Sequence, residues 1–222
     1  MKVEVIENVL KLNDELAAMN RQTLKKAGVF TVNLIGAPGG GKTALLEKTI
    51  PMLKPDVRCA VIVGDLATQR DADRMAKFCD QVIQVNTGKG CHLEAHHVKQ
   101  AIDKLDLSQV DLLFIENVGN LICPVGFDLG QDMKVGMFAV SDGDDKAAKH
   151  PYIVYESGLL ILGKIDLLRY VPFDQELFRA DIRQLNPKVD LIELSITSGI
   201  GLEYWITWLR KKTCTSDRST PR

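Results

Sequence analysis

The sequence predicts an α/β fold, in which a mostly parallel sheet is flanked by helices and preceded by an N-terminal amphipathic helix. Short apolar segments rich in β-branched residues recur along the chain and alternate mostly with stretches of helical character. A glycine-rich turn ending in Lys-Thr joins the first such segment to a helix-forming stretch. These two observations are typical of a wound sheet with a ligand site at its strand ends.

The N-terminal extension, residues 1–28, places several apolar side chains roughly on one helical face. They are Ile6, Val9, Leu10, Leu16 and Met19. We expect this helix to pack on its own domain, with a partner contact as the alternative.

The central domain is predicted to span residues 29–212 and is followed by a polar tail at 213–222. Its predicted strands are Phe30–Ile35, Val57–Val63, Val82–Val85, Leu112–Ile115, Met137–Val140, Leu159–Leu162 and Val189–Leu194. A chain of 222 residues, 45% of them hydrophobic, can bury one sizeable core and is most simply a single domain.

The overall charge and the cysteines exclude several classes of protein. The net charge of -1 offers no broad attraction for nucleic acid or an anionic membrane, so we expect neither as a partner. The sequence shows no signal-peptide pattern and no apolar run near the roughly 20 residues that span a bilayer, so a cytoplasmic protein is expected. The five cysteines form no Cys-x-x-Cys pair, which favours thiols or metal ligands over disulfides, with Cys59 and Cys79 in the core.

The segment from Gly36 to Thr43 fits the phosphate-loop pattern Gly-x-x-x-x-Gly-Lys-Thr, between a strand and a helix. Its glycines let successive backbone N–H groups point at phosphate oxygens, and the following helix adds the positive end of its dipole. Lys42 is expected to bridge the β- and γ-phosphates, and the Thr43 hydroxyl to ligate Mg²⁺. Backbone groups of the cradle are expected from Gly36, Gly39, Gly40, Gly41 and Ala44. The predicted fold is therefore a P-loop nucleoside triphosphatase (NTPase).

Two acidic residues at neighbouring strand ends are candidates for catalysis beside this loop. Asp65 follows Val61–Gly64, and Glu116 follows Leu112–Ile115. Asp65 is expected to coordinate Mg²⁺ or position water, and Glu116 to hold the metal through water or to sense the γ-phosphate. Helix capping or turn formation is the alternative for both residues. Asp71 and Asp73 follow in a segment that we expect to be mobile, or to begin a helix.

A third segment bears on which base is bound. Guanine-binding P-loop proteins carry Asn-Lys-x-Asp at a strand end, and here the corresponding residues are Gly163-Lys164-Ile165-Asp166. Asp166 can accept two hydrogen bonds from guanine, which strongly disfavours adenine. Because the asparagine is missing, its side chain cannot brace this segment against the phosphate loop. The preference for guanine then depends on Asp166. An exposed Lys164–Asp166 ion pair is the alternative. Ser195, after the last strand, is expected to add contacts to the base or to form a helix-entry turn.

Soft metal donors occur in two further segments. Cys91 and His92 follow Thr87–Gly90, and Cys123 follows the Glu116 segment. Thiolates with an imidazole suit Zn²⁺ or Ni²⁺, although the spacing alone is weak support. His92 and His96 stand four residues apart, but Glu94 is misplaced for the zinc-protease pattern. His96, His97 and His150 are expected at the surface or in caps.

Three segments together resemble the HypB family, the nickel-inserting GTPases of nickel-iron hydrogenase maturation. They are Gly88–Ala95, Glu116–Pro124 and Asp142–Lys146, and the resemblance covers about Asn20 to Leu209. It implies a GTP-hydrolysing metallochaperone and nucleotide-dependent homodimer with an interface Ni²⁺ or Zn²⁺ site at Cys91, His92 and Cys123. It also implies two partners, a nickel-delivering accessory protein and the hydrogenase large-subunit precursor.

The chain departs from the family pattern at Gly163, and it begins without the cysteine-rich or histidine-rich N-terminal stretch of some members. Tight N-terminal nickel binding is therefore not expected. Two other functions stay open at this point. A small-molecule kinase would share the phosphate loop, but no arginine-rich lid is visible, and a nucleotide-binding module could recruit a partner without hydrolysis. The absence of an arginine finger also predicts slow turnover.

Overall fold

The computed structural model describes residues 10–65, 70–88 and 90–215. Within them, a seven-stranded sheet has the order β3-β2-β4-β1-β5-β6-β7, and every pairing is parallel. The strands are β1 (Phe30–Gly36), β2 (Cys59–Asp65), β3 (Gln81–Asn86), β4 (Leu112–Glu116), β5 (Met133–Ala139), β6 (Leu159–Gly163) and β7 (Asp190–Glu193). All seven predicted strands are present, so the parallel α/β fold is confirmed. β5 starts earlier than expected because its pairing with β1 begins at Met133.

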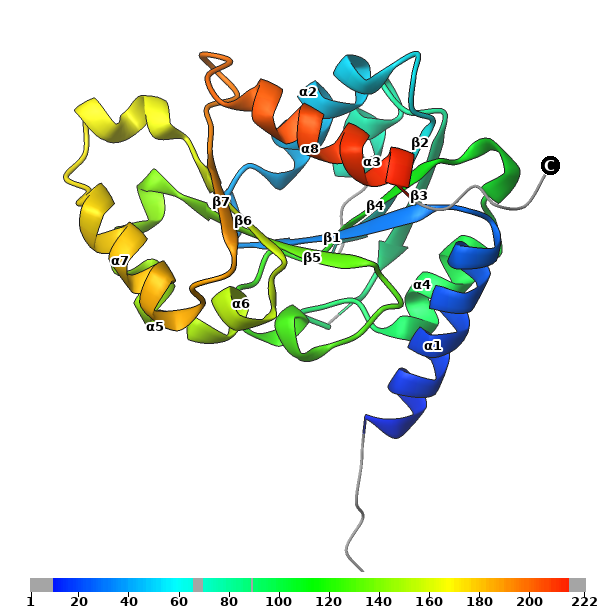
Figure 1. Cartoon of the computed structure of the whole chain (residues 1–222). Coiled ribbons are helices and arrows are strands. Elements are labelled where there is room, and N and C mark those ends of the chain that lie inside the picture. Colours follow the sequence, from blue (N-terminus) through cyan, green and yellow to red (C-terminus); the bar gives the residue numbers. More distant parts are fainter. Residues whose placement is uncertain (1–9, 66–69, 89, 216–222) are drawn as a thin grey trace, which may run out of the picture.

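Helices cover both faces of the sheet, with α2 and α8 on one face and α1, α4 and α6 on the other (Figure 1). The helices are α1 (Lys11–Lys26), α2 (Lys42–Leu53), α3 (Arg70–Met75), α4 (Ala95–Ile102), α5 (Lys146–Lys149), α6 (Pro151–Glu156), α7 (Gln175–Leu185) and α8 (Leu202–Thr215). Short 3-10 turns are η1 (Leu107–Gln109), η2 (Cys123–Gly126), η3 (Val140–Asp142) and η4 (Ile165–Arg169). Within these described elements, no helix is both long and apolar enough to cross a membrane.

Apolar cores fill the space between the sheet and each helical layer. One contains Phe114 of β4 and Trp205 of α8, and another contains Ile62 of β2 and Val98 of α4. Because β1, β2 and β4 are covered on both sides, their sequences are nearly continuous apolar runs. The carboxyl ends of these three parallel strands meet at one edge of the sheet, where ligands bind in open α/β folds.

The N-terminal helix is present, but the buried face differs from the predicted one. Leu10 and Met19 are exposed, whereas the buried positions are Asn13, Ala17, Asn20 and Leu24. Ile6 and Val9 lie outside the described residues. The prediction was wrong for Leu10 and Met19 because the helix packs on the start of α4 and on the loop around Asp128, whose backbone groups need hydrogen-bond partners that amides supply and apolar side chains do not.

The C-terminal helix crosses the predicted start of the polar tail. α8 continues to Thr215, and Thr213 is buried with its hydroxyl donating to the carbonyls of Leu209 and Arg210 at 3.1 and 3.0 Å. Such bonds from a threonine to the preceding turn let a polar residue stay within a helix. Residues 216–222 of the predicted tail lie outside the described part.

Candidate nucleotide and metal sites

The phosphate loop connects β1 directly to α2. β1 ends at Gly36, α2 begins at Lys42, and Gly41 between them has φ +98°, a conformation that side chains other than glycine rarely adopt. This geometry leaves the first backbone N–H groups of α2 without intrahelical partners at the loop. The arrangement is that of an anion site at a helix N-terminus.

Lys42 is folded back onto this loop. Its Nζ donates to the carbonyls of Gly36 and Ala37 at 3.0 and 3.2 Å, and burial lowers the pKa of its ammonium. The carboxylate of Glu116 opposes that lowering. An arriving anion would therefore find a buried cation held by weakly competing carbonyl groups.

Glu116 lies against Thr43. The Thr43 hydroxyl donates to Glu116 Oε1 at 2.6 Å, while the buried Oε2 has no hydrogen-bond partner among the described residues. Burial raises the pKa of Glu116 to about 7, although the Thr43 hydrogen bond and Lys42 both act to lower it. A buried carboxylate oxygen without a partner, beside a hydroxyl, is a donor set that fits a hard cation such as Mg²⁺.

A cavity of about 380 Å³ opens beside the loop and contains both predicted acids. Asp65 and Glu116 line it, together with Lys42 and Thr43 of the loop. Arg74 of α3 also lines it and forms a two-pronged ion pair with Glu47 at 2.8 and 2.7 Å. Sequence reasoning missed Arg74, because nothing in its local pattern links it to the phosphate loop.

The predicted base-binding segment also reaches the phosphate loop. Lys164 Nζ donates to the Gly39 carbonyl at 2.8 Å, and the Ser195 hydroxyl donates to Asp166 Oδ1 at 2.6 Å. At Gly163, an added Cβ would lie 3.6 Å from the Phe138 carbonyl, so there is room for a side chain. Lys164 therefore supplies one brace between the two loops, and the plain Lys164–Asp166 ion pair is not found among the described contacts.

Cys91, His92 and Cys123 lie together in space, as predicted. One donor atom from each lies within 4.8 Å of the others, and Cys91 Sγ is 3.5 Å from His92 Nδ1. A hydrogen bond with Cys123 raises the pKa of Cys91, and burial lowers the pKa of His92. The buried Nε2 of His92 has no hydrogen-bond partner among the described residues and lies 3.9 Å from Glu94 Oε1. Two thiols and a neutral imidazole fit Zn²⁺ or Ni²⁺.

Asn117 connects this cluster to the nucleotide cavity. Its Oδ1 accepts hydrogen bonds from the N–H groups of Leu93 and Val118, both at 3.0 Å, and its Nδ2 donates to Asn33 at 3.2 Å. Leu93 packs against Gly64, where an added Cβ would lie 2.7 Å from Leu93 Cγ. The residue after His92 is thus held against the ends of both β2 and β4.

Comparisons with known proteins show the family to which this chain belongs. A family model described as CobW/HypB/UreG, nucleotide-binding domain, matches residues 30–193. Hydrogenase maturation factor HypB of Escherichia coli (strain K12) is 44% identical over 212 residues, which is 96% of this chain and 73% of that protein. The chain belongs to the HypB family.

Two solved HypB structures share this fold over nearly the whole chain. HypB from Archaeoglobus fulgidus has a TM-score of 0.86 at 40% identity, covering 91% of this chain and 98% of that one. HypB from Helicobacter pylori, solved in complex with nickel, has a TM-score of 0.88 at 34% identity, covering 96% and 100%. The HypB resemblance inferred from three short segments is therefore confirmed.

Two further histidines of this HypB-family chain, His96 and His97, lie in the first turn of α4 and outside the group of three donors. His97 accepts from the Glu94 N–H at 3.1 Å and so caps α4, as expected, while His96 pairs with Glu94 at 3.4 Å. Asn117 and the α1 asparagines escaped sequence reasoning. Asn117 directly follows Glu116, and Asn13 and Asn20 share one helical face with Ala17 and Leu24, a periodicity that could have identified them.

Proposed function

We propose that the chain is a GTP-hydrolysing metallochaperone that assists nickel insertion during nickel-iron hydrogenase maturation. It acts as a nucleotide-dependent homodimer whose interface holds Ni²⁺ or Zn²⁺ at Cys91, His92 and Cys123. Its partners are a nickel-delivering accessory protein and the hydrogenase large-subunit precursor. The family assignment and the two sites described above support this proposal.

At the nucleotide site, backbone N–H groups of Gly36–Ala44 hold the phosphates. Asp166 accepts hydrogen bonds from guanine, and Ser195 holds Asp166 in place through its hydroxyl. Mg²⁺ would be held by Thr43 and Asp65, and by Glu116 through water; when bound, it neutralises charge on the β- and γ-phosphates. The buried Glu116 Oε2 that lacks a partner fits this assignment.

The reaction assigns separate tasks to the side chains. Lys42 leaves the Gly36 and Ala37 carbonyls and places its charge beside the γ-phosphate. Asp65 and Glu116 orient a water molecule whose oxygen attacks the γ-phosphorus. The bond from that phosphorus to the bridging oxygen breaks, which leaves GDP and inorganic phosphate.

The observation that carries the proposal is the Asn117 link between the two sites. Glu116 contacts Thr43 at 2.6 Å, and the next residue, Asn117, holds the Leu93 N–H at 3.0 Å, beside His92. A γ-phosphate that shifts the end of β4 therefore moves a metal donor through one residue and one buried hydrogen bond. Differential metal affinity between the nucleotide states is what such coupling requires.

The test is to measure Ni²⁺ affinity and dimerisation with a non-hydrolysable GTP analogue and with GDP. We expect the two Ni²⁺ affinities to differ by about 5- to 150-fold, with Ni²⁺ changing the ratio of nucleotide affinities by the same factor. Identical affinities together with identical dimerisation would refute the proposal.

Asn117→Ala sharpens this test because it leaves the Leu93 and Val118 N–H groups without their acceptor. It should reduce the difference between the nucleotide states while both ligands still bind. Thr49→Val is the matched control, since it removes a buried 2.8 Å hydrogen bond from Trp205 on the α2/α8 face. A difference preserved in Asn117→Ala would remove this link from the coupling.

A further inference from the structure

The buried polar face of α1 connects the two segments that carry the metal donors. Asn13 is 9% exposed and Asn20 is 2% exposed. Burying an amide is costly unless its polar atoms are hydrogen-bonded. The partners of these two amides therefore explain why asparagine stands at both positions.

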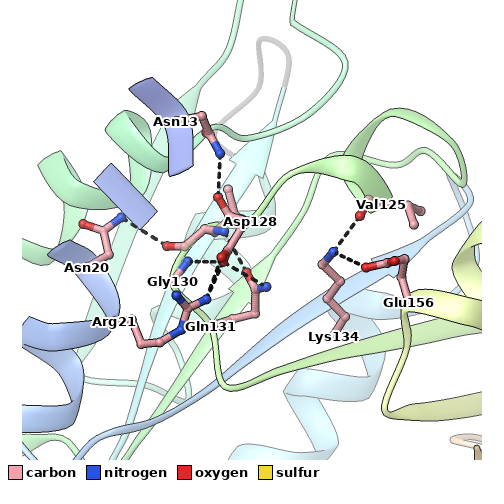
Figure 2. A network of polar contacts seen from close by, with 10 residues as sticks. Asn13, Asn20, Arg21, Val125, Asp128, Gly130, Gln131, Lys134 and Glu156 are labelled. Atoms are coloured by element: carbon pink, nitrogen blue, oxygen red, sulfur yellow. Dashed lines mark hydrogen bonds and ion pairs between the residues drawn. The ribbon is translucent and has the colours of Figure 1, made fainter. Parts of the chain in front are cut away.

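Each asparagine bonds to both segments. Asn13 Nδ2 donates to the Asp128 carbonyl at 2.9 Å, and its Oδ1 accepts from the Ala95 N–H at 2.8 Å. Asn20 Nδ2 donates to the carbonyls of Ala95 and Leu129 at 2.9 and 3.1 Å. Figure 2 shows both amides directed at the loop around Asp128. Ala95 lies three residues after His92, and Asp128 lies five residues after Cys123.

The same loop is held against α1 by two further contacts. Arg21 Nη2 donates to both carboxylate oxygens of Asp128 at 2.7 Å (Figure 2). Gly130, at φ +90°, approaches so closely that an added Cβ would lie 2.6 Å from the Cβ of Asn20. This loop is therefore packed against the helix backbone itself.

The loop then contacts a metal donor directly. The Phe127 ring lies over the His92 ring, with centroids 3.9 Å apart. Nearer to Cys123, Lys134 Nζ donates to the Val125 carbonyl at 2.7 Å and pairs with Glu156 at 3.1 Å (Figure 2). The stretch that follows Cys123 is thus held from outside it at two points.

We propose that Asn13 and Asn20 are positioning residues for the metal cluster, bridging the Cys91-His92 segment and the Cys123 segment at the separation that the donors need. The inference rests on the proposed metal-binding function. Tetrahedral binding at metal–donor distances of about 2.0–2.3 Å requires the donors to lie about 4 Å apart or less. Cys91 and Cys123 are 32 positions apart in the chain, so contacts outside the cluster must set the distance between them.

The test measures the spacing in metal-free protein, through disulfide exchange with glutathione. One cysteine of the Cys91–Cys123 pair attacks oxidised glutathione and releases one glutathione thiolate, and the other cysteine displaces the second. Two protein thiols are oxidised and one glutathione disulfide is reduced. Mass spectrometry of the Cys91–Cys123 peptide across a glutathione series gives the effective concentration of one thiol at the other.

We expect Asn20→Leu to lower this effective concentration about 10-fold and to weaken Zn²⁺ affinity about 10-fold. Losses of this size are the smallest usually seen when a residue that holds a metal ligand in place is removed. Thr49→Val, with a lost buried hydrogen bond on the opposite face of the sheet, should change neither. If Asn20→Leu and Thr49→Val gave the same effective thiol concentration and the same Zn²⁺ affinity, the proposal would be overturned. If Asn20→Leu fails to fold, Asn13→Ala, which also loses one bond to each segment, decides in its place.

The two measurements separate the inference from the function on which it rests. A wild-type protein that binds neither Zn²⁺ nor Ni²⁺ would refute the proposed function and the metal-positioning role with it. Wild-type metal binding with unchanged thiol proximity in both asparagine variants would refute the positioning role alone.

Discussion

The phosphate loop and the metal cluster are built in opposite ways. The loop is one continuous segment, Gly36–Ala44, that presents backbone N–H groups between a strand and a helix. The cluster takes side chains from two loops, and these loops are hydrogen-bonded to Asn117 and to the α1 asparagines. Local chain geometry builds the first site, while long-range hydrogen bonds assemble the second.

Lys42→Ala breaks the first site with the largest expected effect. It removes the buried ammonium on which the β- and γ-phosphates depend, so GTP hydrolysis should fall on the order of 1000-fold, comparable to losing a key electrostatic donor. Phosphate release measures this, with the exposed Lys48→Ala on the same helix as the control. Retained Mg²⁺-dependent GTP binding and turnover would contradict the assignment of the cradle.

Cys123→Ser breaks the second site and should leave the first intact. Loss of a thiolate donor should weaken Ni²⁺ or Zn²⁺ affinity on the order of 100-fold. GTP hydrolysis, measured with Mg²⁺ but without Ni²⁺ or Zn²⁺, should be unchanged. Competition with a chromophoric chelator measures the affinity. Cys214→Ser, at an exposed position on α8, is the matched control and should bind metal like the wild type.

Glu116→Gln sharpens the comparison through pH. Burial raises the Glu116 pKa from its ordinary 4.5 to about 7, so the folded protein holds this proton more tightly than the unfolded chain does. The associated stability is fully present below pH 4.5 and is lost as the pH rises through 7.

Urea unfolding without nucleotide or metal measures this effect. Between pH 4.5 and 7.5, the free energy of unfolding of the wild type should fall relative to Glu116→Gln by on the order of 2–3 kcal/mol. Parallel pH curves for the two proteins would show that burial does not raise the pKa of Glu116.

Gly163→Asn should give the smallest effect. A Cβ fits at this position, 3.6 Å from the Phe138 carbonyl and 3.9 Å from the Gly40 carbonyl, so an asparagine can add a hydrogen bond beside the Lys164 brace. Such a bond is worth about 1 kcal/mol, or about 5-fold in GTP affinity. Titration with labelled GTP and ATP measures it.

Asp166→Asn, tested by the same titration, should abolish the GTP preference. An unaltered preference for GTP over ATP would contradict the guanine assignment.

The sequence predicted the two sites to different extents. Strand, loop and helix around Lys42 could be assigned from neighbouring residues, and Asp65 and Glu116 were placed correctly at the ends of β2 and β4. For Cys91, His92 and Cys123, spacing alone was weak support, and the family resemblance identified the set. Asn117, Asn13 and Asn20, which bond to the donor loops, were missed because the groups they bond to lie up to 115 positions away.

By itself, the sequence determined the parallel α/β fold and the strand-loop-helix context of the phosphate loop. The reason is that apolar periodicity and glycine conformations act between near neighbours. Only the tertiary structure decided which face of α1 is buried, how Lys164 and Asp166 are held, and how the two donor loops come together. Those outcomes depend on which backbone N–H and C=O groups remain unpaired after folding, and side chains distant in the chain supply the partners.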